Sequence, residues 1–271
     1  MLHEFEDKDY CCAYLPRAPR VGRDVLLSFR DRALLFDGET LPRLTDAMVK
    51  AGGLRYLFSI SEVAFFLAET PLAETTDLHY DSVRMLRRLS PQWLAFGGMT
   101  GLHLACWYSE NRYCGACATP LAHKDDERAL VCPHCGRVYY PNIAVAVIVG
   151  IIDGDRIMLS RYAYGAYHNH ALIAGYVEIG ETLEDAVRRE VMEEIGLNIK
   201  NIRYNTSQPW GFSHALLVGF FADLDGASGV RIEPRELSEA VWVARSEMPV
   251  SDDRISMTAR MMEAFRKGEA V

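Results

Sequence analysis

The sequence has no long hydrophobic run, no excess of positive charge, no internal repeat and no low-complexity stretch. Its longest apolar run, residues 143–152, is too short to cross a bilayer as a helix. The opening residues, MLHEFEDKDY, lack the basic and apolar regions of a signal peptide. With a net charge of −8, the chain is not typical of proteins that hold nucleic acid by bulk electrostatics. We therefore expect a cytoplasmic protein with no membrane partner.

The chain has ample apolar material for folding, since 49% of its 271 residues are hydrophobic and 24% are charged. Changes in composition predict three parts. Residues 1–108 mix apparent strands and helices without a chemical motif, so we expect an α/β domain that acts as a scaffold or in dimer formation. Residues 109–142 are crowded with cysteine, glycine and charge, and hold too little apolar material for a core of their own. Residues 143–271 alternate strand and helix patterns.

The apolar patterns also predict individual helices and strands. In the first part we expect a hairpin over Asp24–Phe36, a strand followed by a helix over Leu54–Glu69, and a helix towards the end of Pro91–Tyr108. In the last part, the turn at Asp153–Asp155 is expected to join two strands. The strands predicted there are 143–152, 156–161, 201–204, 215–222 and 240–244, and the helices are 182–195 and 257–267.

Four of the seven cysteines form two Cys-x2-Cys pairs, with Cys114 and Cys117 in the first and Cys132 and Cys135 in the second. Two such pairs place four thiolates on facing turns, which is the tetrahedral ligand set that zinc prefers. Four cysteines close the coordination sphere and leave no position for water. The bound zinc is therefore expected to be structural.

A second chemical feature is the glutamate-rich segment 175–197, GYVEIGETLEDAVRREVMEEIGL. Its apolar residues recur every four positions, which predicts an amphipathic helix that ends before the last glycine. Glu190, Glu193 and Glu194 are at i, i+3 and i+4, so they project from one face. A hard divalent cation such as Mg²⁺ or Mn²⁺ would relieve their repulsion, bind a diphosphate and activate water. The preceding loop adds Glu181 and Glu178, and Glu178 is a possible general base or further ligand.

This segment resembles the Nudix box, Gly-x5-Glu-x7-Arg-Glu-aliphatic-x-Glu-Glu-x-Gly-aliphatic. The positions of the box are all filled here, by Gly175, Glu181, Arg189, Glu190, Val191, Glu193, Glu194, Gly196 and Leu197. The resemblance implies a Nudix fold, which is an α-β-α sandwich around a mixed sheet. It also implies that Glu190, Glu193 and Glu194 bind the catalytic metal ions. Arg189 would hold the loop and the helix together through Glu181.

Downstream, Ser207-Gln208-Pro209-Trp210 is similar to the SQPWPFPxS signature of NADH pyrophosphatases. That family carries a four-cysteine zinc ribbon before its Nudix domain and a further domain before the ribbon, in the order found here. The resemblance implies hydrolysis of the diphosphate of NADH or NAD⁺ to nicotinamide mononucleotide and AMP by a homodimer. Where the family reads PFPxS, this chain reads GFSHA over residues 211–215. The loss of both prolines favours a more flexible loop.

The same resemblance implies further residues of the site. Those near the bound nucleotide are Tyr176, which would stack on a ring, and Gln208, Trp210, Tyr140 and Ala259. Because the family completes its site across the dimer, Trp210 or Tyr140 would serve the site of the partner. Glu236 resembles a metal carboxylate outside the box, and Glu239 is the competing choice.

Two alternatives stay open. The altered 211–215 loop allows a different substrate for the same chemistry, namely ADP-ribose, FAD, a dinucleoside polyphosphate or NAD-capped RNA. RNA is expected as a partner only in this NAD-capped form. The other alternative is a non-catalytic nucleotide-binding or RNA-contact module. The intact glutamates argue against that module, because a sensor need not keep three costly like charges on one face.

Overall fold

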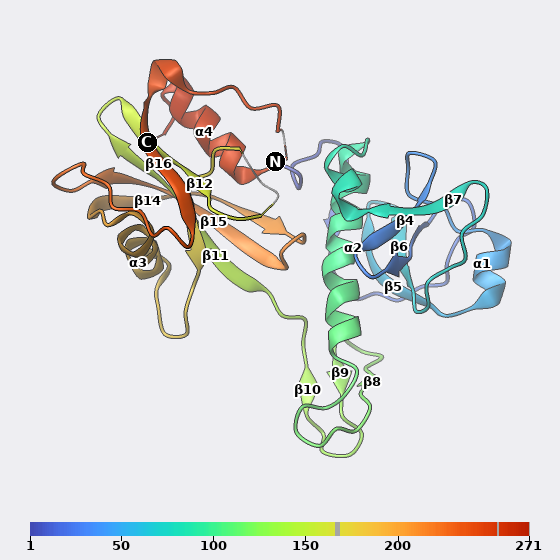
Figure 1. The fold of residues 1–271 in the computed structure, drawn as a ribbon. Helices are drawn as coiled ribbons and strands as arrows, with labels where there is room; N and C mark the ends of the chain where they lie inside the picture. The colour runs from blue at the N-terminus through green and yellow to red at the C-terminus, as the bar shows by residue number, and fades with distance from the viewer. Residues whose placement is uncertain (166–168, 254, 271) are drawn as a thin grey trace. The chain divides into compact units, whose positions relative to one another are not determined.

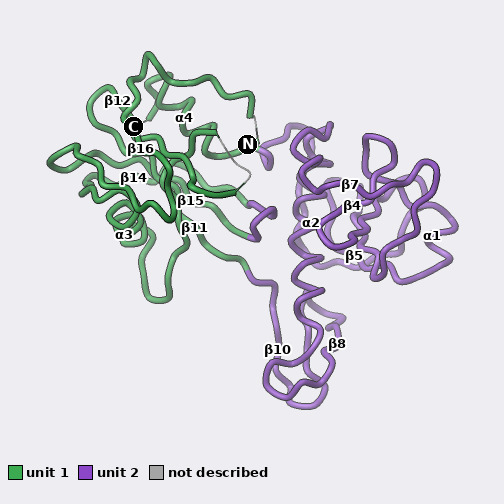
Figure 2. Tube along the Cα trace, in the orientation of Figure 1, with its two compact units in different colours: residues 1, 143–209, 215–271 green, residues 2–142, 210–214 purple. Residues whose placement is uncertain are grey.

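The computed structural model describes residues 1–165, 169–253 and 255–270 (Figure 1). The chain forms two compact units (Figure 2). The first contains Met1, Ile143–Pro209 and the chain from Ala215 onward, and the second contains Leu2–Asn142 together with Trp210–His214. Within the described residues, no helix combines the length and the apolar character needed to cross a membrane.

The second unit begins with two small sheets that share a core. One sheet has the order β1-β5-β6-β2, from β1 (Tyr10–Cys11), β2 (Val25–Leu27), β5 (Leu54–Ile60) and β6 (Val63–Ala68). The other has the order β3-β4-β7, from β3 (Phe29–Arg30), β4 (Ala33–Asp37) and β7 (Leu78–Ser82). The helices are α1 (Asp46–Ala51), the 3₁₀ helix η1 (Val83–Arg87) and α2 (Gln92–Glu110), which confirms the helix predicted before residue 108.

The segment 54–69 corrects one prediction. Its second half is a strand and not a helix, because β6 pairs with β5 antiparallel from Ile60↔Val63 to Leu54↔Ala68. A continuous apolar run has no period that separates a buried strand from a buried helix. The two strands meet at a tight turn in which Ser61 has a φ of +48°. The hairpin predicted over residues 24–36 is present only as β3 and β4, because β2 pairs with β6 in parallel.

The first unit is built on a mixed sheet with the order β14-β15-β11-β12-β16, and β13 also pairs with β11. Its strands are β11 (Ala144–Asp153), β12 (Arg156–Tyr162), β13 (Ile173–Tyr176), β14 (Ile199–Trp210), β15 (Ala215–Leu224) and β16 (Leu237–Ala244). β11 and β15 run parallel, with Ala144 opposite Ala215 and Ile152 opposite Asp223. β11 pairs antiparallel with β12 and β13.

Helices α3 (Leu183–Ile195) and α4 (Met257–Lys267) pack into separate cores on the two faces of this sheet (Figure 1). Successive side chains of a strand point to opposite faces, so Val147 and Val149 of β11 pack with α3 while Ile148 packs with α4. A short 3₁₀ helix, η2 (Arg245–Glu247), follows β16. The arrangement confirms the predicted α-β-α sandwich with a mixed sheet. Strand β14 is longer than the predicted 201–204, because its exposed polar residues hide it in the apolar pattern.

Candidate active site and zinc ribbon

Helix α3 carries the glutamates and has a defined cap at each end. The hydroxyl of Thr182 accepts a hydrogen bond from the backbone N–H of Asp185, and Gly196 ends the helix with a φ of +69°. The apolar stripe of α3 is buried against the sheet. Glu190 and Glu194 are buried with it, at 9% and 3% exposure. Carboxylates buried side by side in this way need a counter-charge.

Gly175, near the end of β13, makes room for Glu190. A Cβ atom on Gly175 would come closer than 3.0 Å to the carboxylate carbon of Glu190, a separation that real Cβ atoms essentially never show. The missing side chain therefore lets α3 set this carboxylate directly against the strand. The first glycine of the box has a steric function in the site.

Arg189 connects the loop, the strand and the helix. Its guanidinium donates to both carboxylate oxygens of Glu181, with Nε–Oε1 at 2.6 Å and Nη2–Oε2 at 2.9 Å, and Nη2 also donates to the carbonyl of Tyr176 at 2.9 Å. Nη1 donates to Glu190 at 2.7 Å and to Glu193 at 3.0 Å. Hydrogen bonding by Arg189 lowers the pKa of Glu181 to about 2, so this carboxylate stays charged.

Glu194 is the most perturbed carboxylate of the helix. Burial, reinforced by the charges of Glu190 and Glu236, raises the pKa of Glu194 to about 8. Burial also raises the pKa of Glu190. Glu194 Oε2 is buried and has no hydrogen-bond partner among the described residues. An unpartnered carboxylate oxygen is the kind of ligand that hard divalent cations prefer. Among the described residues, however, the ligand atoms of the glutamates do not come within 4.8 Å of one another as a group, as those of the four cysteines do.

Glu236 and Glu239, the two candidate carboxylates outside the box, have different neighbours. Glu239 on β16 forms an ion pair with Arg161 on β12, with Oε2 and Nε 2.7 Å apart. Glu236 lies just before β16, and its charge raises the pKa of both Glu190 and Glu194. This coupling to α3 makes Glu236 the better candidate for a metal ligand.

A pocket of about 320 Å³ in the first unit is lined by residues that include Arg161, His170, the segment 249–253 and Ala259 of α4. Nη2 of Arg161 lies 3.0 Å from Nε2 of His170. Burial, and then the charge of Arg161, lowers the pKa of His170. Ala259 was predicted from the sequence, whereas Arg161 and His170 were not, because they belong to no motif.

Tyr176 and Gln208, both predicted to lie at the nucleotide, differ in exposure. Tyr176 is 52% exposed at the end of β13, so its ring is open to a ligand. Gln208 is fully buried, and its Nε2 donates to the carbonyl of Ile255 at 2.7 Å. Gln208 Oε1 has no hydrogen-bond partner among the described residues. The amide of Gln208 thus supports the chain just beyond the segment that lines the pocket.

Tyr140 and Trp210 belong to the second unit. Tyr140 is 56% exposed, and its hydroxyl donates to Glu127 at 3.2 Å. The ring of Trp210 packs edge-on against Phe212, with centroids 5.0 Å apart, and the guanidinium of Arg87 lies over both rings. The predicted substrate residues are therefore divided between the two units.

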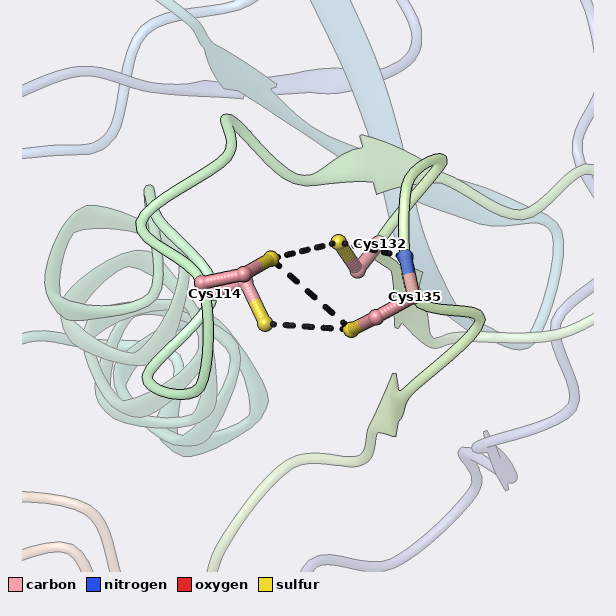
Figure 3. A group of neighbouring side chains, drawn as sticks. Cys114, Cys132 and Cys135 are labelled. Atoms are coloured by element: carbon pink, nitrogen blue, oxygen red, sulfur yellow. Dashed lines mark hydrogen bonds between the residues drawn. The ribbon is translucent and has the colours of Figure 1, made fainter.

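The four cysteines flank the strands of a small sheet of order β10-β9-β8, from β8 (Ala122–His123), β9 (Leu130–Val131) and β10 (Val138–Tyr139). Cys114 and Cys117 precede β8, and Cys132 and Cys135 lie between β9 and β10. Their sulfur atoms all lie within 4.8 Å of one another, and Cys132 and Cys135 face Cys114 across the site (Figure 3). The Sγ–Sγ distances are 3.6 Å for Cys114–Cys135, 3.5 Å for Cys117–Cys132 and 3.8 Å for Cys117–Cys135. Zn–S bonds of about 2.3 Å give a tetrahedron with edges of about 3.8 Å, so this set fits zinc.

Comparison with known families finds two matching domains. Residues 109–140 match the NADH pyrophosphatase zinc ribbon domain, and residues 141–265 match the NUDIX domain. The chain therefore carries a NADH pyrophosphatase zinc ribbon domain followed by a NUDIX domain. The ribbon cysteines and the glutamates of α3 thus lie in two adjacent matched domains, while residues 1–108 lie outside both matches.

The relatives of this protein include the "NAD-capped RNA hydrolase NudC" of Salmonella heidelberg (strain SL476), 42% identical over 163 residues. The protein of the same description from Photorhabdus laumondii is 41% identical over 163 residues. These matches cover 60% of this chain and 63% of each relative, so the chain matches less than two thirds of their length. A solved NUDIX hydrolase from Nitrosomonas europaea covers 59% of this chain and 95% of its own, with a TM-score of 0.47 and 21% identity.

Proposed function

We propose that this protein hydrolyses the diphosphate bond of NADH or NAD⁺ to nicotinamide mononucleotide and AMP. The observation that carries the proposal is the buried, unpartnered oxygen of Glu194, a residue whose pKa is raised by burial and then by the charges of Glu190 and Glu236. A diphosphate does not approach such a group of negative charges without cations between them. The zinc ribbon matched in front of this site is named for NADH pyrophosphatases, which supports a dinucleotide substrate.

Mg²⁺ or Mn²⁺ fits the oxygen-only ligand set of Glu190, Glu193, Glu194 and Glu236. When bound, these ions neutralise the diphosphate, polarise phosphorus and lower the pKa of an attacking water. Arg189 keeps Glu190 and Glu193 in position through its hydrogen bonds. Glu178, which is exposed in the same loop as Glu181, is the proposed general base or a further ligand.

For the nucleotide, we propose that the exposed ring of Tyr176 stacks on a base and that the pocket beside Ala259 receives one end of the dinucleotide. Gln208 acts by supporting the chain next to that pocket. The protein would act as a homodimer in which Tyr140 and Trp210 serve the partner's site. Light scattering coupled to size exclusion tests the dimer, and a monomer at working concentration contradicts it.

Product analysis tests the enzymatic proposal. The purified protein is incubated with NADH, NAD⁺, ADP-ribose or FAD in the presence of Mg²⁺ or Mn²⁺, and AMP and nicotinamide mononucleotide are separated by chromatography. We expect AMP from NADH or NAD⁺. Glu193→Gln is expected to lose most of this activity, while Glu184→Gln on the same helix keeps it. Faster turnover of ADP-ribose than of NADH or NAD⁺ would make ADP-ribose the better candidate substrate. Tight binding of a nucleotide without turnover would indicate a non-catalytic nucleotide-binding module.

A second candidate is removal of the NAD cap from RNA, because the relatives from Salmonella and Photorhabdus are named for it. The net charge of −8 offers no broad basic surface, so we propose that the cap and not the RNA body is recognised. Turnover of NAD-capped RNA is then expected to depend weakly on salt. A steep loss of kcat/KM with added salt indicates phosphate contacts along the RNA and contradicts this proposal.

A further inference from the structure

The tip of the β14–β15 hairpin, Trp210–His214, is held by residues from the first half of the chain. It belongs to the same compact unit as Leu2–Asn142. The carbonyl of Phe212 lies 3.5 Å from Nη2 of Arg32. The ring of His214 stacks on that of His103 of α2, with centroids 5.1 Å apart, and His103 contacts the carbonyl of Asn142 at 2.9 Å. The contacts of Arg32 and His103 thus fix two different residues of the tip, Phe212 and His214.

Gly211 is the point of closest approach in this tip. A Cβ atom there would come closer than 3.0 Å to the carbonyl oxygen of Met99, a backbone atom of α2 that cannot rotate away. The glycine is therefore required by the packing against α2. The family's proline at this position would not fit this contact, which gives a physical reason for its replacement in this chain.

Arg87, the last residue of η1, contacts the aromatic side chains of the tip. Its guanidinium carbon lies 5.4 Å from the ring centroid of Trp210 and 5.9 Å from that of Phe212. The two rings meet edge to face at 5.0 Å. A planar cation over two rings favours one orientation of the pair, because the attraction depends on the position of the charge over the ring face.

We infer that Arg87 is a positioning residue for Trp210, and that residues 1–142 order the 210–214 loop in place of the prolines that this chain lacks. The inference rests on the proposed function, in which Trp210 contacts the dinucleotide. A loop ordered before binding costs less entropy when the substrate arrives. The first hundred residues, which carry no chemical motif, thereby act on substrate affinity through the loop and not through the carboxylates of α3.

Fluorine NMR on the full-length protein labelled with 5-fluorotryptophan, combined with steady-state kinetics on NADH, tests this inference. The chain has four tryptophans, and Trp210→Phe assigns the resonance of Trp210. In Arg87→Ala we expect this resonance to shift or broaden while the other three stay in place. We expect KM to rise roughly three- to tenfold with kcat nearly unchanged. Arg87→Lys keeps the charge but loses the planar group. Its Trp210 resonance and its KM are therefore expected to lie between those of the wild type and of Arg87→Ala.

Arg84→Ala is the matched control, since Arg84 is an exposed arginine on the same 3₁₀ helix. It is expected to leave both the resonance and KM unchanged. An unmoved Trp210 resonance in Arg87→Ala overturns the inference, and so does a moved resonance with an unchanged KM. If the wild-type protein turns over no dinucleotide, the proposed function fails. The resonance alone then decides whether Arg87 orders the loop.

Discussion

The carboxylate of Glu190 occupies the space that a side chain on Gly175 would fill. Because Arg189 also donates to Glu190 at 2.7 Å, this carboxylate is fixed from two sides before any metal binds. The position of the Glu190 carboxylate therefore depends on Gly175, a strand residue that has no side chain.

Gly175→Ala tests this dependence. The new methyl group must displace Glu190, so we expect a roughly 10- to 100-fold loss in kcat and a loss of about 1–3 kcal/mol in the free energy of unfolding, as for overpacked cores. Gly229→Ala is the control, because a Cβ atom at Gly229 meets nothing within 4 Å. Full activity in Gly175→Ala would show that Glu190 has other productive positions.

The raised pKa of Glu194 predicts how the metal-free protein responds to pH. The folded chain keeps a proton that the unfolded chain releases, so the stabilisation is fully present below about pH 4.5 and is lost as the pH rises to about 8. In chelator, we expect the Tm of the wild type to fall across this window. Added Mg²⁺ should restore the Tm at pH 8 by binding the charged form.

Glu194→Gln separates the contribution of Glu194 to the fall in Tm from that of other titrating groups. The amide carries no charge at any pH, so the fall in Tm between pH 5 and pH 8 is expected to become smaller and the response to Mg²⁺ weaker. Glu184→Gln on the exposed face should behave like the wild type. Identical pH profiles for Glu194→Gln and wild type, measured by scanning calorimetry in chelator, would contradict the assignment.

Glu236 and Glu239 are distinguished by their partners. Glu236→Gln is expected to raise the Mg²⁺ concentration for half-maximal activity by roughly tenfold or more, since it removes a negative charge beside Glu190 and Glu194. Glu239→Gln breaks a largely exposed pair with Arg161 and is expected to cost less than about 1 kcal/mol of stability. If the Mg²⁺ concentration for half-maximal activity rose in Glu239→Gln and not in Glu236→Gln, Glu239 would be the metal ligand.

Loss of one ribbon cysteine tests the zinc assignment. Wild-type protein is expected to bind about one zinc per chain. Cys132→Ser removes a buried member of the set and should lower the zinc content and the Tm together. Cys12→Ser changes an exposed cysteine outside the ribbon and should alter neither value. Elemental analysis that finds full zinc occupancy in Cys132→Ser would exclude this cysteine as a ligand.

The parts of the fold that could be predicted from sequence are those with local causes. Helix α3 has its start at Thr182, its end at Gly196 and its apolar stripe within a single segment, so the sequence alone defines it. The cysteine spacing likewise defines the ribbon. The strand at Val63–Ala68 was missed because its identity depends on a partner, β5, and not on its own pattern.

The parts of the site that could not be predicted depend on contacts that no local pattern indicates. Arg161 and His170 lie beside the antiparallel bridge between Ser160 and Ala171, which brings their side chains together. Arg87 meets Trp210 across nearly half of the sequence, and no motif at Arg87 indicates the pairing. Motifs name the groups that do chemistry, whereas the residues that hold those groups in place are visible only in three dimensions.

The parallel pairing of β11 with β15 has a consequence for synthesis. β11 is the central strand of its sheet, yet one of its neighbours, from Ala215 onward, is far along the chain. During translation, the edge of β11 that pairs with β15 stays unpaired until β15 has left the ribosome, and the apolar strand is exposed for that time. Contacts this distant slow folding, so nascent chains that stop before Leu224 are expected to be prone to aggregation.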